Sequence, residues 1–274
     1  MMNTRLLPVV GSLLAFPLLA QASDKSAFHL FNPTPRELMR DMSTDRPDVT
    51  ESPITVDAGH LQVEMSFVEY ARDRSTDRFD VAPLNLKIGL TNFADLQLVL
   101  NPYTHIESAE VAVDGFGDTQ VRLKLNMWGN DGGTTALALM PFITLPTGDG
   151  DVGVSEVEGG LIIPFSTELP AGFGLGLMLE LDCVRNDADD GYRLDLVHSA
   201  AVGREIAGPL GGFVEYVGVM PFDPDDGADS YIATLGGGCT YAISPDLQLD
   251  AAVQFGLTDS ADDFSILLGL SFRI

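Results

Sequence analysis

The sequence predicts an all-β protein, a transmembrane antiparallel β-barrel of about 12 strands. Three observations lead to this prediction. Apolar residues recur at every second position in segments of about ten residues, short turns alternate with longer loops, and the chain opens with an export signal. A period of two is the period of a strand, and ten to twelve residues match a tilted membrane crossing rather than the shorter strands of globular sheets.

The first 22 residues have the three parts of a secretory signal. Met1 to Arg5 gives a positive start, Leu6 to Leu19 is apolar, and Ala20-Gln21-Ala22 is a small-residue cleavage site. We therefore expect residues 1–22 to be a signal peptide. An N-terminal membrane anchor is the alternative, but the apolar stretch is short for a span and contains two prolines. Beyond it, no run of about 18 apolar residues predicts a transmembrane helix.

Residues 23–58 are predicted to form an N-terminal segment that precedes the barrel, and residues 41–53 within it are charged and prone to turns. Pro47 and Pro53 disfavour regular structure around them. Two interpretations remain open: a solvated periplasmic tail, or a segment that folds back into the barrel's periplasmic mouth. In the second, arginines of the segment would pair with lumenal carboxylates such as Glu64 or Glu158. The candidate plug residues are Arg40, Arg46 and Asp48.

Residues 59–274 are predicted to form the barrel. In one clear case, Val121, Leu123, Leu125 and Met127 alternate with polar residues that include two cations. The expected strands are 59–70, 81–91, 94–104, 116–128, 134–146, 156–166, 171–183, 191–203, 209–220, 230–242, 246–257 and 263–274.

The connections between these strands alternate in length, which is typical of transmembrane barrels with short periplasmic turns and longer external loops. Gly, Pro, Asn and Asp mark the short turns. The expected short turns are 91–95, 129–133, 169–172, 207–209 and 243–246. The expected external loops, mostly longer and more acidic, are 71–80, 104–115, 147–155, 184–190, 221–229 and 258–262.

A soluble β-sandwich or lipocalin-like barrel would also bury an alternating apolar face, so it is the alternative fold. The polar faces favour the membrane barrel because they combine glycines with charges of both signs, which suits a hydrated interior. Twelve tilted strands give a backbone diameter of roughly 24 Å and a lumen of about 10 Å or less. Candidate pore-lining residues, which would set charge selectivity, are Lys87, Arg122, Lys124, Glu158, Glu180, Arg193, Asp195, Glu215 and Gln254.

Four short segments of the chain resemble sequences of a known family. The segment from Asp41 to Pro53, followed by Thr55 to Glu64, is similar to the opening of the outer-membrane proteins grouped as the phenol-degradation MetA-pathway transporter family. Residues 86–91 and 95–98 resemble that family's next strands. The resemblance runs from about residue 41 to the end. It implies an outer-membrane barrel of a Gram-negative bacterium that transports small, often aromatic or hydrophobic compounds.

Composition and charge exclude other classes. With 40 acidic against 15 basic residues, the net charge of −25 repels phosphate backbones, so no nucleic-acid partner is expected. A hydrophobic fraction of 45% argues against disorder. No cofactor is expected. The acidic external loops show no complete calcium-loop spacing, so we expect no dedicated metal site, although loose bridging of cations to lipopolysaccharide phosphates remains open.

Histidines, cysteines and aromatic residues are candidates for catalysis, disulfide formation and ligand stacking. His198 precedes Ser199 in one strand, and neighbours on a strand face opposite sides, so the two are not a base and nucleophile pair. By alternation His198 faces lipid, and we expect a local bulge to turn it inward. Cys183 and Cys239 lie on nonadjacent strands and are expected to be free thiols. Aromatic residues near strand ends, Phe67, Tyr70, Phe79, Tyr103, Trp128, Phe142, Phe165, Tyr192, Phe222, Tyr231 and Tyr241, predict interfacial girdles.

The resulting prediction is a non-enzymatic outer-membrane channel for passive uptake of small molecules, with hydrophobic or aromatic compounds implied by the resemblance. The alternative is a structural or surface-interaction barrel with a plugged lumen. The expected partners are outer-membrane lipid and lipopolysaccharide, a small-molecule solute, and the periplasmic chaperones and barrel-assembly machinery that insert such proteins.

Overall fold

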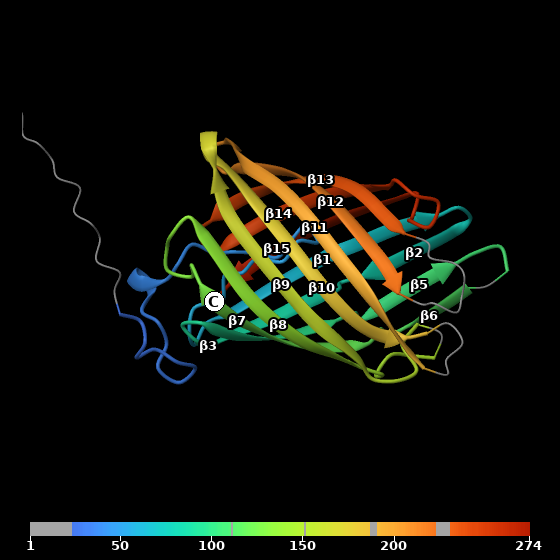
Figure 1. Cartoon of the computed structure of the whole chain (residues 1–274), viewed down its shortest axis with the longest axis horizontal. Helices are drawn as coiled ribbons and strands as arrows, with labels where there is room; N and C mark the ends of the chain where they lie inside the picture. The colour runs from blue at the N-terminus through green and yellow to red at the C-terminus, as the bar shows by residue number, and fades with distance from the viewer. Residues whose placement is uncertain (1–23, 111, 151, 187–190, 223–230) are drawn as a thin grey trace, which may run out of the picture.

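The computed structural model describes residues 24–110, 112–150, 152–186, 191–222 and 231–274. These residues form one antiparallel β-sheet that closes on itself because its first strand pairs with its last (Figure 1). No helix in these ranges is long and apolar enough to cross a membrane. The expected signal peptide and all the aspartates of the expected loops 184–190 and 221–229 lie outside the described residues.

The secondary structure is almost entirely β. The strands are β1 (Leu61–Asp73), β2 (Thr76–Val81), β3 (Leu84–Thr91), β4 (Ala94–Leu100), β5 (Tyr103–Glu107), β6 (Ala112–Gly115), β7 (Thr119–Trp128), β8 (Thr135–Leu145), β9 (Glu158–Leu169), β10 (Phe173–Arg185), β11 (Tyr192–Ala207), β12 (Leu210–Phe222), β13 (Ile232–Ser244), β14 (Leu247–Gly256) and β15 (Phe264–Arg273). Two single-turn 3-10 helices are η1 (Arg36–Leu38) and η2 (Pro170–Gly172).

Within the described residues these strands make 12 crossings of the barrel wall, which confirms the predicted fold class. Three crossings are each divided into two strands: β2 with β3, β5 with β4, and β6 with β7. Pro83, Pro102 and Gly117 lie in the three breaks. Proline lacks the N–H that a ladder needs, so a break or bulge is the expected consequence in the first two.

The five predicted short turns lie between the expected pairs of strands, at the end of the barrel that also holds the C-terminus (Figure 1). Two predicted external loops are wrong. Most of 71–80 and 104–115 is strand, and only Arg74 and Ser75 separate β1 from β2. These strand ends carry polar pairs such as Tyr70 with Asp77, where the hydroxyl to carboxylate distance is 2.6 Å. With polar side chains on both faces, the hydrophobic alternation disappears although the ladder continues.

The N-terminal segment enters the barrel from the short-turn end and is fastened to β3. The Gly59 N–H donates to the Gly89 carbonyl at 2.8 Å, and Ala58 forms a parallel bridge with Gly89. A Cβ atom at Gly89 would overlap the carbonyl oxygen of Asp57. Only glycine permits this close approach. From here, residues 41–57 lie inside the barrel or at its mouth, and we call residues 41–58 the lumenal segment.

Replacing Gly89 with valine should release the lumenal segment, because the new side chain occupies the space of the Asp57 carbonyl. We expect larger single-channel conductance in a planar bilayer and faster trypsin cleavage after the buried Arg40. Gly174→Val is the matched control, since a Cβ at Gly174 meets nothing within 4 Å. Equal protection of Arg40 in both variants would contradict this assignment.

Candidate functional site in the barrel lumen

One wall of the lumen is charged and carries two buried lysines. Alternation on β1, β3, β4 and β7 turns Gln62, Glu64, Lys87, Gln97 and Lys124 inward, and each is almost completely buried. The carboxylate that joins the lysines comes from the lumenal segment. Both oxygens of Asp45 accept from the Lys124 Nζ at 2.9 Å, and Lys87 pairs with Asp45 and with Glu64.

The burial of these ions decides how firmly the segment is held. Lys87, Lys124 and Asp45 are 2%, 1% and 6% exposed in their side chains. Desolvation offsets much of the attraction in such a cluster, so its net contribution is small. Removing one partner is costly, at about 3–5 kcal/mol, because a buried charge is then left unpaired. The cluster therefore specifies one seated position of the segment.

A second set of contacts ties the lumenal segment to the closing strands of the barrel. Arg46 pairs with Asp250 of β14 at 2.8 Å and with Glu69 of β1 at 3.4 Å. Arg273 of β15 donates to the carbonyl of Arg40 at 2.9 Å and lies 3.5 Å from the Asp57 carboxylate. The segment thus contacts both sides of the β1–β15 seam.

The third set of contacts lies across the lumen on β11 and β12. Glu215 accepts the backbone N–H groups of Val49 and Thr50, at 3.0 and 2.7 Å, and the Thr50 hydroxyl at 2.6 Å. The Thr50 hydroxyl also lies 2.7 Å from that of Ser199. Because the segment is attached to opposite walls, it spans the lumen and narrows it.

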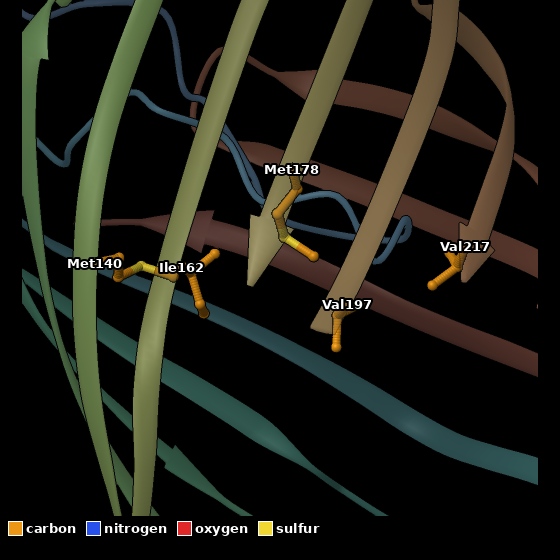
Figure 2. Packing of buried hydrophobic residues seen from close by; sticks show 5 residues of the cluster. All are labelled: Met140, Ile162, Met178, Val197 and Val217. Carbon is orange, nitrogen blue, oxygen red and sulfur yellow. The ribbon is translucent and has the colours of Figure 1, made fainter. Parts of the chain in front are cut away.

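The wall formed by β8 to β12 carries an apolar stripe on its lumenal side. Met140, Ile162, Met178, Val197 and Val217 come from five consecutive strands and are all buried (Figure 2). Phe142 and Val219 pack against them. We call these seven residues the apolar ladder. The backbone N–H of Glu51 in the lumenal segment lies 3.5 Å from the Met178 sulfur, so the segment touches the ladder.

A cavity of about 580 Å³ lies between the lumenal segment and the barrel wall. Its lining includes Arg46, Asp48, Thr50 and Glu51 from the segment. The strands opposite contribute mostly small residues, Ala136, Ser166, Gly174, Gly176, Ala201, Gly203, Gly211 and Gly212. The seated segment therefore leaves a space large enough for a small organic molecule.

The remaining predicted pore-lining residues lie on other parts of the wall. Arg122 pairs with Glu51 at 2.5 Å, and Glu180 faces it from β10. Arg193 pairs with Asp195 at 3.0 Å. Glu158 accepts the N–H of Arg185 at 2.8 Å, and Gln254 lines a separate cavity of about 230 Å³. Within the described ranges, no three or more metal-ligating side chains gather into a site.

Two plug residues have partners other than those expected. Arg46 pairs with Asp250 and Glu69 rather than with Glu64 or Glu158. Arg40 lies at the mouth, where it contacts Asp57 and the turn residues Asn92 and Asp131. Which lumenal carboxylates an arginine reaches depends on the register of the segment, and the sequence does not show that register.

Two side-chain orientations also differ from the sequence-based expectation. No bulge turns His198 inward: β11 keeps regular register there on both sides, and the ring stacks on Tyr231, whose hydroxyl lies 2.9 Å from its Nε2. Tyr231 also pairs with Tyr216, so the polar ring is satisfied on the outer wall. Phe142 packs on the lumenal ladder rather than in a girdle. Cys183 and Cys239 are free thiols, as expected.

A comparison with protein families shows to which family this chain belongs. The model described as the putative MetA-pathway of phenol degradation matches residues 44–274. The chain belongs to this family. No curated protein matches the sequence. The match begins within the lumenal segment, one residue before Asp45, so the family region includes the segment as well as the barrel.

The chain is also similar to solved structures, and one of those that follow shares its fold. The COG4313 outer membrane channel from Pseudomonas putida F1 has a TM-score of 0.64 at 12% identity, over 85% of this chain and 100% of that chain. The KdgM porin has a TM-score of 0.47 at 10% identity, over 78% and 98%. The CymD monoaromatic hydrocarbon channel has a TM-score of 0.45 at 11% identity, over 78% and 87%. The first of these shows that the family member shares the barrel fold of that channel.

Sequence reasoning missed two parts of this family member's site. Asp45, which joins both lysines, was not among the candidate plug residues, although it is adjacent to Arg46. The sequence does not predict the apolar ladder, because its residues, such as Met178 between Leu177 and Leu179, occupy positions at which the alternation predicts polar side chains. An apolar residue on the polar face of a barrel strand is the sequence signal that could have indicated an apolar patch in the lumen.

Two acidic groups of the lumenal segment have raised pKa values. Burial and the neighbouring Asp45 carboxylate raise the pKa of Glu51 to about 7, although Arg122 and Lys124 oppose the shift. Burial and the carboxylate of Glu215 raise the pKa of Asp48. Burial alone would raise the pKa of Asp45, but Lys124 and Lys87 hold it well below its usual range.

We expect the seated segment to loosen as pH rises from 5.5 to 8. A released Glu51 titrates near 4.5 and a seated one near 7, so seating takes up a proton in this window and is weaker once Glu51 ionises. Open probability should increase by up to about tenfold per pH unit below 7. Glu51→Gln should make the profile shallower, and the raised pKa of Asp48 accounts for the pH dependence that remains. A wild-type channel with no pH dependence between 5.5 and 8 would contradict this assignment.

Proposed function

We propose that the protein is an outer-membrane channel of a Gram-negative bacterium through which small hydrophobic molecules cross passively. The lumenal segment acts as a plug that closes the route when seated. The protein performs no chemical reaction on its solute. Its lipid surroundings are outer-membrane lipid and lipopolysaccharide, and chaperones and the barrel-assembly machinery insert it.

The apolar ladder is the observation that carries this proposal. A water-filled pore for ions or sugars is lined by polar groups throughout, whereas here five strands place methionine, isoleucine and valine side chains on the lumenal side. Apolar solutes gain free energy from contact with such a stripe, at about 25 cal/mol per Å² of apolar area removed from water. The description of the family, which refers to phenol degradation, supports an aromatic solute.

A disulfide between the plug and the wall should lock the channel shut. The hydroxyl oxygens of Thr50 and Ser199 are 2.7 Å apart, so cysteines at both positions lie within bonding reach. In a background with Cys183→Ser and Cys239→Ser, oxidation of Thr50→Cys/Ser199→Cys should abolish conductance and reduction should restore it. The single Thr50→Cys variant is the control. Unchanged conductance after verified crosslinking would exclude a plug role.

A polar group within the apolar ladder should slow apolar solutes selectively. Ile162→Asn places an amide against the passing molecule at a cost of about 1–2 kcal/mol, which corresponds to roughly tenfold slower uptake of labelled toluene into whole cells that produce the channel with Gly89→Val, whose plug is released. Ser265→Asn, in the lining of the second cavity, is the matched control. Equal toluene uptake in the two variants would show that the ladder is not on the route.

A structural or surface-interaction barrel is the second candidate. The observation that favours it is the plug itself, because ion pairs and hydrogen bonds attach it to three separate parts of the wall. Conductance separates the two functions. A correctly folded protein that stays electrically silent, even with Gly89→Val, would favour the structural role.

A further inference from the structure

Lys87 and Lys124 converge on one point of the lumen although they belong to different strands. β3 and β7 flank β4 in the sheet, and their two lysines meet at the carboxylate of Asp45. Lys124 reaches both of its oxygens at 2.9 Å. The Ser52 N–H adds a hydrogen bond of 2.8 Å to the same carboxylate. This is the arrangement of a carboxylate-binding site, and a residue of the chain itself occupies it.

The described part of the wall supplies no ion-pair partner for Lys124. Glu64 pairs with Lys87. Asp95, the cross-strand neighbour of Lys124, accepts instead from the Val56 N–H and the Gln97 amide, each at 3.0 Å. Among the described residues, the carboxylates within ion-pair distance of Lys124 are Asp45 and Glu51, and both belong to the plug. When the plug withdraws, this cation loses both of these anionic partners and becomes available to another anion.

The same short stretch of plug joins the lysine pair to the apolar ladder. Asp45 occupies the lysines, and six residues later the Glu51 N–H contacts the Met178 sulfur. The cavity of about 580 Å³ adjoins this stretch. A molecule that replaced it would therefore meet cations at one end and apolar side chains at the other.

We propose that Asp45 occupies a binding site for the carboxylate of a ligand. Small organic anions with an apolar body, such as aromatic carboxylates, displace Asp45 from Lys87 and Lys124 and so release the plug. This inference rests on the proposed channel function and adds the substrate class and the opening signal. A neutral alcohol of the same shape lacks the charge that replaces Asp45, so the site discriminates anions from neutral analogues.

The first experiment tests opening of the full-length protein in a planar bilayer by benzoate, with benzyl alcohol as the neutral analogue of similar size. Benzoate at millimolar concentration should raise the open probability of the wild type at least threefold and saturate. Benzyl alcohol should leave it unchanged. An equal response to both solutes, or to neither, would overturn the proposal.

The second experiment tests binding, because Lys124→Gln by itself also loosens the plug. In the Gly89→Val protein, whose plug is displaced, equilibrium dialysis should show one bound benzoate per chain. Adding Lys124→Gln should abolish this binding, and Lys124→Arg should preserve it. Arg78→Gln, which removes an arginine paired with Asp80 at 2.9 Å, is the matched loss of one positive charge and should preserve binding. Binding that survives Lys124→Gln would overturn the proposal.

These outcomes separate the inference from the channel function. If neither the wild type nor Gly89→Val conducts in any solute, the channel function fails and the inference fails with it. If both conduct but benzoate binding does not depend on Lys124, only the inference is overturned.

Discussion

The buried ion cluster of Asp45 with Lys87 and Lys124 is the interaction on which the lumen depends. Two lysines on a barrel wall, each almost inaccessible to water, are tolerated only if anions meet them. The wall provides Glu64 for one lysine, and the other depends on the plug. Barrel and plug are therefore electrostatically incomplete without each other. This requirement explains why a segment without regular secondary structure holds one position inside the barrel.

The plug also divides the lumen by chemistry. Charged residues of β1, β3, β4 and β7 face its acidic and basic side chains, whereas β8 to β12 present the apolar ladder and many glycines beside a few carboxylates such as that of Glu215. A uniformly polar lumen would be filled with water and would favour hydrated ions. The observed lumen instead offers a route along the apolar ladder. The lumenal segment, which spans the lumen, sets the width of this route.

The fold was largely predictable because membrane burial enforces strict alternation where strands contact hydrocarbon. Val121, Leu123 and Leu125 point outward for that reason, and the 12 crossings follow from counting such rows. Prediction failed where the solvent is the same on both faces, as in β2 and β6, because no hydrophobic contrast marks the strand. It also failed for contacts within the site. The pairing of Arg46 with Asp250 joins residues 204 positions apart, and Asp45 is one of many acidic residues in the sequence.

The position of the plug across the β1–β15 seam bears on assembly. Residues of the lumenal segment contact Asp250 and Arg273, which are synthesised much later. These contacts join residues 204 and 216 positions apart, and contacts of such large sequence separation are slow to form in folding. Closure of the sheet therefore encloses the lumenal segment, and that segment bridges the two edges that must meet. The plug thus holds the first and last strands in position while the barrel closes.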